Sequence, residues 1–260
     1  KLKLNLKKNF GSSKIDLITG GPPCQGFSGI GIRRSYSVDK EQLPSNHLFQ
    51  DMAYFIQQMK PKAFIFENVE GLLTAKWNTK GLKGEIFKEV LKTFMSLKGY
   101  NVKHKLIHAK DYGVPQNRPR ILIIGILSNI SKDHNISFDA LEGGFLPEVI
   151  GNPPHLEEIF DDIIDTKFKY GGQTKHYPSD AKTYWQKKLR TKKNKIFKKG
   201  DELTDHEYSN HSLNTQAKFK AMIKNKGIIP EEFKTKKFAQ RLLPKKWGNR
   251  GPSITITSLA

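Results

Sequence analysis

The chain has 260 residues, of which 45 are Lys or Arg and 25 are Asp or Glu, so its formal net charge is +20 at pH 7. Hydrophobic residues make up 37% of the chain, which is enough to bury a core and excludes wholesale disorder. One cysteine, Cys24, excludes an internal disulfide framework and a cysteine-rich zinc site, and no metal site is expected. Because it has neither a long apolar run nor a secretion signal at its start, we expect a soluble cytoplasmic protein, associated with the nucleoid if it is bacterial.

The excess of positive charge indicates a polyanionic partner. A sequence pI near 9.8 is typical of proteins that neutralise nucleic-acid phosphates. A lysine-rich surface that serves solubility explains the composition equally well, and an acidic lipid surface is a third, weaker alternative. Composition therefore indicates a class of partner and leaves the function open.

The first half of the chain alternates strands and helices. The predicted strands are the apolar runs 14–19, 63–66, 101–109 and 121–127. The predicted helices are 48–59 and 85–97, whose apolar residues recur at helical spacing. Ser45 or Asn46 is the predicted N-cap of the first helix. This order predicts an α/β fold, a sheet core with right-handed crossovers.

The pattern changes after about residue 130. Glycine and proline pairs interrupt this stretch, and its hydrophobic residues show no sustained periodicity. Within it we predict a helix at 212–226 and a short strand within 244–258. Nine basic residues and no acidic residue lie between Ala181 and Gly200. We therefore predict a core in residues 1–130, a basic irregular region in 131–240 and a segment returning to the core in 241–260.

The most distinctive motif is Gly-Gly-Pro-Pro-Cys-Gln-Gly-Phe-Ser at 20–28, just beyond a predicted strand. In open α/β sheets, ligands bind beyond the carboxyl ends of the strands. Cys24 therefore lies where chemistry is expected. The alternatives are an inert buried cysteine and a tight turn with no further role.

Two further motifs flank later strands. Glu67-Asn68-Val69 follows the second strand, and a partly buried carboxyl there can stay protonated and donate a hydrogen bond to a ring nitrogen. Gln116-x-Arg118-x-Arg120 precedes the last strand, and an extended backbone directs both guanidinium groups to one face. Such a pair suits a phosphate or a base carbonyl. The alternatives are a capping or surface carboxylate and ordinary surface charges.

Together these motifs resemble the DNA cytosine-5 methyltransferase family. The match rests on Pro22-Pro23-Cys24 with Phe27-Ser28, on Glu67-Asn68-Val69, and on Gln116-x-Arg118-x-Arg120. It covers roughly residues 14–127 and 238–260, with Leu48-Phe49 and Arg241–Ser258 as further similar segments. The resemblance implies a Rossmann-like, S-adenosylmethionine-dependent methyltransferase core, incomplete in this chain, and a target-recognition region in the basic stretch.

The resemblance also implies a mechanism. The Cys24 thiolate would add to carbon 6 of a cytosine flipped out of duplex DNA, and carbon 5 would accept the methyl group of S-adenosylmethionine. Glu67 would bind ring nitrogen 3 and Arg120 the carbonyl oxygen, with Arg118 ordering the same cleft. The implied cofactor contacts are Gly21, Pro23 and Leu48. The implied DNA contacts are Gln25, Ser28 and Arg33 in a closing loop, and Lys187, Lys188, Lys192, Lys193 and Lys195 in the basic stretch.

The chain also departs from the family pattern. The glycine-rich Phe-x-Gly-x-Gly cofactor loop is not found, and Asn9–Ser13 lies too close to the first strand to replace it. We expect a portion of a longer enzyme, one half of a split enzyme whose second chain supplies missing strands, or a degenerate DNA-binding member. An RNA cytosine methyltransferase is a further alternative. We expect the chain alone to bind S-adenosylmethionine weakly or not at all.

Overall fold

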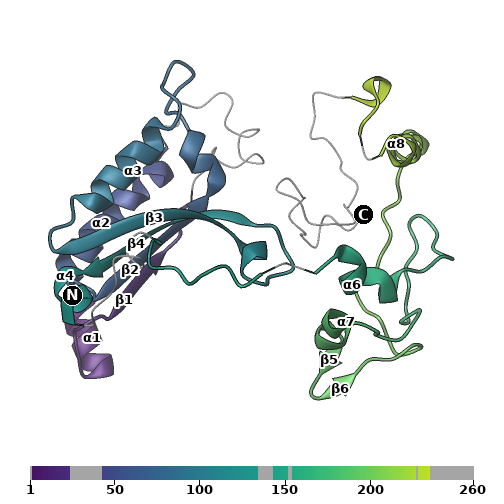
Figure 1. Cartoon of the computed structure of the whole chain (residues 1–260), viewed down its shortest axis with the longest axis horizontal. Helices are drawn as coiled ribbons and strands as arrows, with labels where there is room; N and C mark the ends of the chain where they lie inside the picture. Colours follow the sequence, from purple (N-terminus) through teal and green to yellow (C-terminus); the bar gives the residue numbers. More distant parts are fainter. Residues whose placement is uncertain (1, 24–42, 134–142, 152–153, 227, 235–260) are drawn as a thin grey trace. The chain divides into compact units, whose positions relative to one another are not determined.

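The computed structural model describes residues 2–23, 43–133, 143–151, 154–226 and 228–234 (Figure 1). The chain divides into two compact units, each described here by itself. The first comprises residues 1–109 and 119–149, and the second comprises 110–118 and 150–260. The sequence-based division into 1–130, 131–240 and 241–260 separates regions by their expected functions, and it stays a prediction. Within the described ranges, no helix has both the length and the apolar composition needed to cross a bilayer.

The first unit is built on a four-stranded sheet in the order β1-β2-β4-β3 (Figure 1). The strands are β1 (Leu17–Gly20), β2 (Ala63–Val69), β3 (Tyr100–His108) and β4 (Pro119–Leu127). β1 is parallel to β2, whereas β4 lies antiparallel between β2 and β3. The four predicted strands and the α/β fold class are confirmed.

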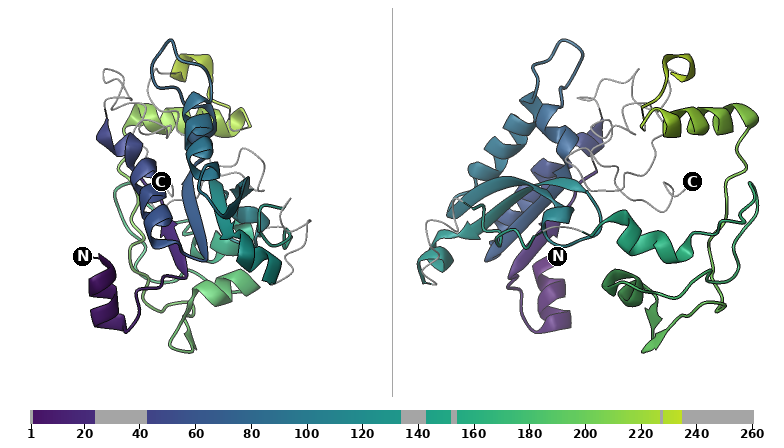
Figure 2. Two further views of the ribbon diagram at one scale, coloured as in Figure 1. Left: turned by 90° about the vertical axis from the view of Figure 1, so that its left-hand side faces the viewer. Right: turned by 45° about the vertical axis from the view of Figure 1, so that its right-hand side comes forward.

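Two helices connect the strands and pack together with the sheet in one core (Figure 2). α2 (Leu48–Met59) lies between β1 and β2 in the sequence, and α3 (Glu85–Met95) lies between β2 and β3. The Phe64 ring contacts Phe94 and lies over Gly125, where a Cβ would come within 2.1 Å of it. The unit also contains α1 (Leu2–Phe10), α4 (Ser128–Asp133), and the 3-10 turns η3 (Pro44–His47) and η4 (Glu70–Thr74). The 3-10 turn η5 (Ala109–Asp111) begins in this unit and continues into the second at Lys110.

The outer edge of β1 is open in the part of the chain that the structure describes. β1 pairs with β2 alone, and its Leu17 is 49% exposed. Tyr54 and Phe55 of α2 are also exposed. Apolar side chains of β1 and α2 are therefore left uncovered within the described residues.

Three local predictions were wrong in their boundaries. Ser45 and Asn46 lie inside η3, because Pro44 begins a helical turn before α2, and the N-cap is His47. Glu67-Asn68-Val69 does not follow β2 but forms its last three residues, since each pairs with a residue of β4. Arg120 likewise lies within β4 and not before it, because it pairs with Val69 of β2. Cross-strand pairing extends a strand into polar residues that its own sequence does not mark as β.

The second unit consists of short elements. Its helix predicted at 212–226 is confirmed as α8 (Leu213–Lys224), capped by the Ser212 hydroxyl, which accepts a hydrogen bond from Thr215 N. The remaining elements are too short to give a periodic pattern. They are α6 (Leu156–Phe160), η6 (Asp161–Ile163), α7 (Tyr184–Leu189), β5 (Thr191–Lys192), β6 (Lys195–Ile196) and η7 (Glu231–Phe233).

Candidate active site

The end of β1 lies tightly between α2 and β2. A Cβ at Gly20 would come 2.7 Å from the Met52 sulfur, and a Cβ at Gly21 would come 3.0 Å from the Glu67 Oε2. Glycine at both positions therefore lets the turn approach the helix and the carboxylate closely. The glycines of Gly20–Pro23 therefore permit close packing at this strand end, and the approach of a ligand to them stays a prediction.

Asn68 ties β2 to this turn. Its side-chain Nδ2 donates to the Pro22 carbonyl oxygen at 3.2 Å, and the Val69 N–H donates to its Oδ1 at 2.7 Å. The residue is 4% exposed, so these bonds form away from water. Sequence reasoning assigned no separate role to Asn68. A buried amide between two motifs is visible only when the strands are in place.

The Glu67 carboxylate forms an ion pair with Arg120 of the neighbouring strand. Arg120 Nε lies 2.5 Å from Glu67 Oε1, as an ion pair without hydrogen-bond geometry at that nitrogen. The register pairs Arg120 with Val69 and Glu67 with Leu122, so the two side chains are diagonal neighbours on one face. The Arg120 Nη1 donates to the Pro119 carbonyl oxygen at 2.8 Å.

Glu67 is partly buried, as the sequence suggested. Its side chain is 43% exposed, while that of Arg120 is 18% exposed. The carboxylate therefore faces a cation on one side and stays accessible on the other. A carboxylate presented in this way can accept a hydrogen bond from an incoming polar group while its orientation is fixed.

The other predicted catalytic and DNA-contact residues are only partly described. Cys24, which follows Pro23 in the sequence, and Gln25, Ser28 and Arg33 lie outside the described residues. Arg118 is exposed and belongs to the second unit, so its place in the same cleft stays a prediction. The five lysines are also in the second unit. Lys187 and Lys188 lie on α7, and Lys192, Lys193 and Lys195 lie on or between β5 and β6.

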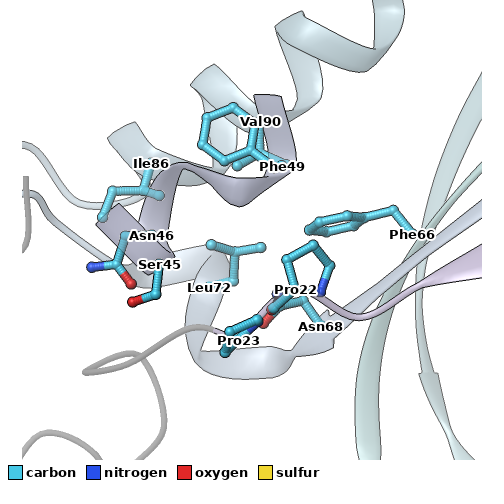
Figure 3. Close-up of a pocket in the computed structure, with 10 residues that line it drawn as sticks. All are labelled: Pro22, Pro23, Ser45, Asn46, Phe49, Phe66, Asn68, Leu72, Ile86 and Val90. Carbon is cyan, nitrogen blue, oxygen red and sulfur yellow. Dashed lines mark hydrogen bonds between the residues drawn. The ribbon is translucent and has the colours of Figure 1, made fainter. Parts of the chain in front are cut away.

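Gly21, Pro23 and Leu48, the three residues expected to contact the cofactor, enclose little space. Gly21 and Pro23 are exposed at the turn, and Leu48, the first residue of α2, is 36% exposed. A hollow beside the turn measures about 10 Å³, which is roughly room for one water (Figure 3). Its lining residues are Pro22, Pro23, Ser45, Asn46, Phe49, Phe66, Asn68, Leu72, Ile86 and Val90. The described residues therefore do not fit S-adenosylmethionine by themselves.

A tryptophan that the sequence did not single out holds the start of α2. Trp77 stacks on His47, with ring centroids 5.0 Å apart and an interplanar angle of 10°. Two carboxylates of α3 fix the tryptophan, since Glu85 Oε1 accepts from its backbone N–H at 2.7 Å and Glu89 Oε2 accepts from its indole Nε1 at 3.1 Å. The segment after β2 is thereby locked against the residue that precedes Leu48.

The chain is similar to known DNA methyltransferases. The type II methyltransferase M.DdeI of Desulfomicrobium norvegicum is 32% identical over 178 residues, which cover 68% of this chain and 39% of the relative. The type II methyltransferase M1.HphI of Haemophilus parahaemolyticus is 41% identical over 122 residues, or 46% of this chain and 30% of the relative. The chain thus spans less than two fifths of the length of these curated relatives.

Solved structures and a family model complete the comparison. The solved structure of the Entamoeba histolytica methyltransferase EhMeth matches 67% of this chain and 46% of its own, at 15% identity and a TM-score of 0.37. The family model described as C-5 cytosine-specific DNA methylase matches residues 2–250. Because this match spans nearly the whole chain, the chain belongs to the C-5 cytosine-specific DNA methylase family.

Proposed function

We propose that this chain is part of an enzyme that methylates carbon 5 of a cytosine flipped out of duplex DNA, with S-adenosylmethionine as the donor. The observation that carries the proposal is the Glu67–Arg120 pair beside the Gly21-Pro22-Pro23 turn. This turn leads directly to Cys24 in the sequence, at the carboxyl end of β1. A nucleophile, a carboxyl group and a guanidinium group are the three functions needed to activate a pyrimidine ring at carbon 5.

Cys24 supplies the covalent step of the proposed reaction. Its thiolate adds to carbon 6 of the cytosine, so a C–S bond forms and the electron pair of the 5,6 double bond moves into the ring. Carbon 5 would become an enamine-type nucleophile for the methyl group that bound S-adenosylmethionine would supply. A base would then take the carbon 5 proton, which restores the double bond and releases the Cys24 thiolate. Because carbon 6 is covered in a stacked duplex, the base must first leave the helix.

Glu67 and Arg120 stabilise the ring during this addition. In its protonated form, the Glu67 carboxyl donates a hydrogen bond from its accessible side to ring nitrogen 3, where negative charge develops when the thiolate adds. Arg120 holds Glu67 in place and provides a guanidinium group for the base carbonyl. Arg118, and Gln25, Ser28 and Arg33 of the segment after Cys24, are proposed to order the same cleft and close it over the DNA.

The donor site needs more than the described residues. Gly21, Pro23 and Leu48 are proposed to line a part of it, and the start of α2 is held for this purpose by the Trp77–His47 stack. The open edge of β1 can pair with a further parallel strand. We propose that such strands, from a longer polypeptide or from a second chain, pair there and complete the site.

Duplex DNA is the proposed macromolecular substrate. The net charge of +20 suits a polyanion, and the relatives named above are type II methyltransferases. DNA methylation in the cytoplasm, as a part of restriction–modification, is the corresponding biological setting. A family member that methylates RNA, or that binds DNA without turnover, is the alternative.

Covalent trapping tests the proposed function. The protein in its full natural length is incubated with S-adenosylmethionine and a pool of duplexes that contain 5-fluorocytosine. Fluorine at carbon 5 prevents the final elimination, so we expect a protein–DNA adduct that survives denaturing electrophoresis. The Cys24→Ser variant should bind DNA and form no adduct. If the unsubstituted protein forms no adduct with DNA, or forms one with RNA only, the proposal is wrong.

A further inference from the structure

The second unit carries a short basic hairpin whose shape is fixed by its turn. β5 and β6 are antiparallel, with Thr191 paired to Ile196 and Lys192 paired to Lys195. The two residues between them, Lys193 and Asn194, have φ values of 47° and 63°. Positive φ at both central positions is the requirement of a type I′ turn, which closes the tightest hairpins. Three lysines therefore lie within four consecutive positions of one narrow ribbon.

The lysines of this hairpin are exposed and have no acidic neighbour. Every residue from Thr191 to Ile196 is exposed. Among the residues that the structure describes, no carboxylate forms an ion pair with Lys192, Lys193 or Lys195. Three clustered ammonium groups that repel one another without compensation favour an external polyanion.

The two ends of the hairpin are anchored in the second unit. The Phe197 N–H, just after β6, donates to the Arg190 carbonyl oxygen, just before β5, at 2.9 Å. The Arg190 guanidinium makes two bonds of 2.9 Å to Asp162 and one of 3.1 Å to the Ile159 carbonyl oxygen. Side-chain exposure is 10% for Arg190 and 1% for Asp162. The Phe197 ring also stacks on Tyr177 at 5.8 Å.

The α7 lysine next to the hairpin is engaged differently. The Lys188 ammonium lies 5.7 Å from the Tyr184 ring centroid and 5.5 Å from that of Trp185, on its own helix. It is thus partly committed to aromatic rings, whereas no hairpin lysine lies over an aromatic ring of the described residues. This difference separates two groups within the basic stretch that the sequence treats as one.

We infer that the β5–β6 hairpin is a preformed element that contacts the DNA backbone, with Lys192, Lys193 and Lys195 neutralising phosphates. The buried Asp162–Arg190 pair holds it in position. This inference rests on the proposed function, because it takes duplex DNA as the partner. A rigid ribbon meets the phosphates with little loss of conformational entropy, which distinguishes it from a flexible lysine-rich loop.

Salt dependence of DNA binding tests this inference. Binding of the full chain to a labelled duplex is measured by fluorescence anisotropy over a series of KCl concentrations. The variant Lys192→Gln/Lys193→Gln/Lys195→Gln should lower the slope of log K against log salt by about 2 to 3, because each neutralised phosphate contributes about 0.9. Far-UV circular dichroism should stay unchanged, since the three side chains are exposed.

A matched charge control decides the outcome. The variant Lys169→Gln/Lys220→Gln/Lys224→Gln removes three exposed lysines of the same unit, and its slope should change by less than about 1. Equal slope changes in both variants would show a general charge effect and overturn the inference. A change on RNA duplexes with none on DNA would overturn it as well. Trapping at Cys24 is independent of these slopes, so failure of the proposed function and failure of the hairpin role can be told apart.

Discussion

Glu67 and Arg120 illustrate how two ordinary residues form a candidate site. Each alone is a charged residue at a strand end, and a partly exposed ion pair contributes modestly to stability. The ion pair orients the Glu67 carboxyl group: it is fixed at a defined position beside Gly21, with one side accessible. At the residue scale, the expected effect of a substitution is therefore on the reaction and much less on folding.

The Glu67→Gln variant tests this expectation. It keeps the shape of the side chain but loses the charge that holds Arg120, and we expect methyl transfer to fall about 10²- to 10³-fold, as when one preorganised transition-state contact is removed. The melting temperature should change little because the side chain is 43% exposed. Single-turnover methylation of DNA and a thermal melt are the two measurements.

The control variant for this experiment is Asp16→Asn. Asp16 pairs with Lys62 at 2.8 Å in the same unit, with both side chains more than half exposed. Its removal should leave the methylation rate unchanged. If Glu67→Gln and Asp16→Asn had the same rate as the unsubstituted protein, Glu67 would have no part in the chemistry.

At the scale of elements, the hairpin depends on a buried ion pair that is remote in the sequence. Asp162 and Arg190 are 28 residues apart, and they join η6 to the end of α7. Removing one partner of a buried pair leaves the other charge without compensation, which costs about 3–5 kcal/mol. Replacing both by apolar residues costs much less.

We therefore predict that Asp162→Ala destabilises the second unit and releases the hairpin. Urea unfolding should show a loss of about 3–5 kcal/mol, and amides around Phe197 should exchange faster with deuterium. The double variant Asp162→Leu/Arg190→Met should recover a large part of the stability. Glu231→Gln, which removes an exposed pair with Lys234, should cost at most about 1 kcal/mol. An Asp162→Ala variant as stable as that control would contradict the prediction.

At the scale of the whole molecule, the sheet is open where the donor site is expected. The hollow of about 10 Å³ beside the diproline turn cannot hold S-adenosylmethionine, and β1 has one unpaired edge within the described residues. We therefore propose that this chain supplies the residues that activate the base, and that the described residues form only a part of the donor site.

We predict that the 260-residue chain alone binds S-adenosylmethionine weakly or not at all. Isothermal titration calorimetry should give no saturable heat at micromolar ligand concentration, because Gly21, Pro23 and Leu48 cover only a small part of such a ligand. DNA binding measured on the same sample is the control for folded protein. Submicromolar affinity for the cofactor would show that this chain forms a complete donor site.

The sequence by itself determined the motifs, the family and most of the elements of the first unit. Apolar runs that end in Gly-Gly-Pro-Pro, and helices with one apolar face, are local patterns, and residues adjacent in the chain specify them. The short elements of the second unit, η6 and α7 among them, were not predictable, because three to six residues give no period.

Only the tertiary structure decided which residues meet. The contact between Glu67 and Arg120 depends on the register of β4 between β2 and β3, and the anchoring of the hairpin depends on Asp162 reaching Arg190. Strand pairing and the cost of burying an unpaired charge determine which residues distant in the chain come into contact. Neither of these two effects can be read from the local sequence pattern. Composition indicated a polyanion for the excess of basic residues. The fold distinguished Lys188, which lies over two aromatic rings, from the exposed hairpin lysines that we propose bind the polyanion.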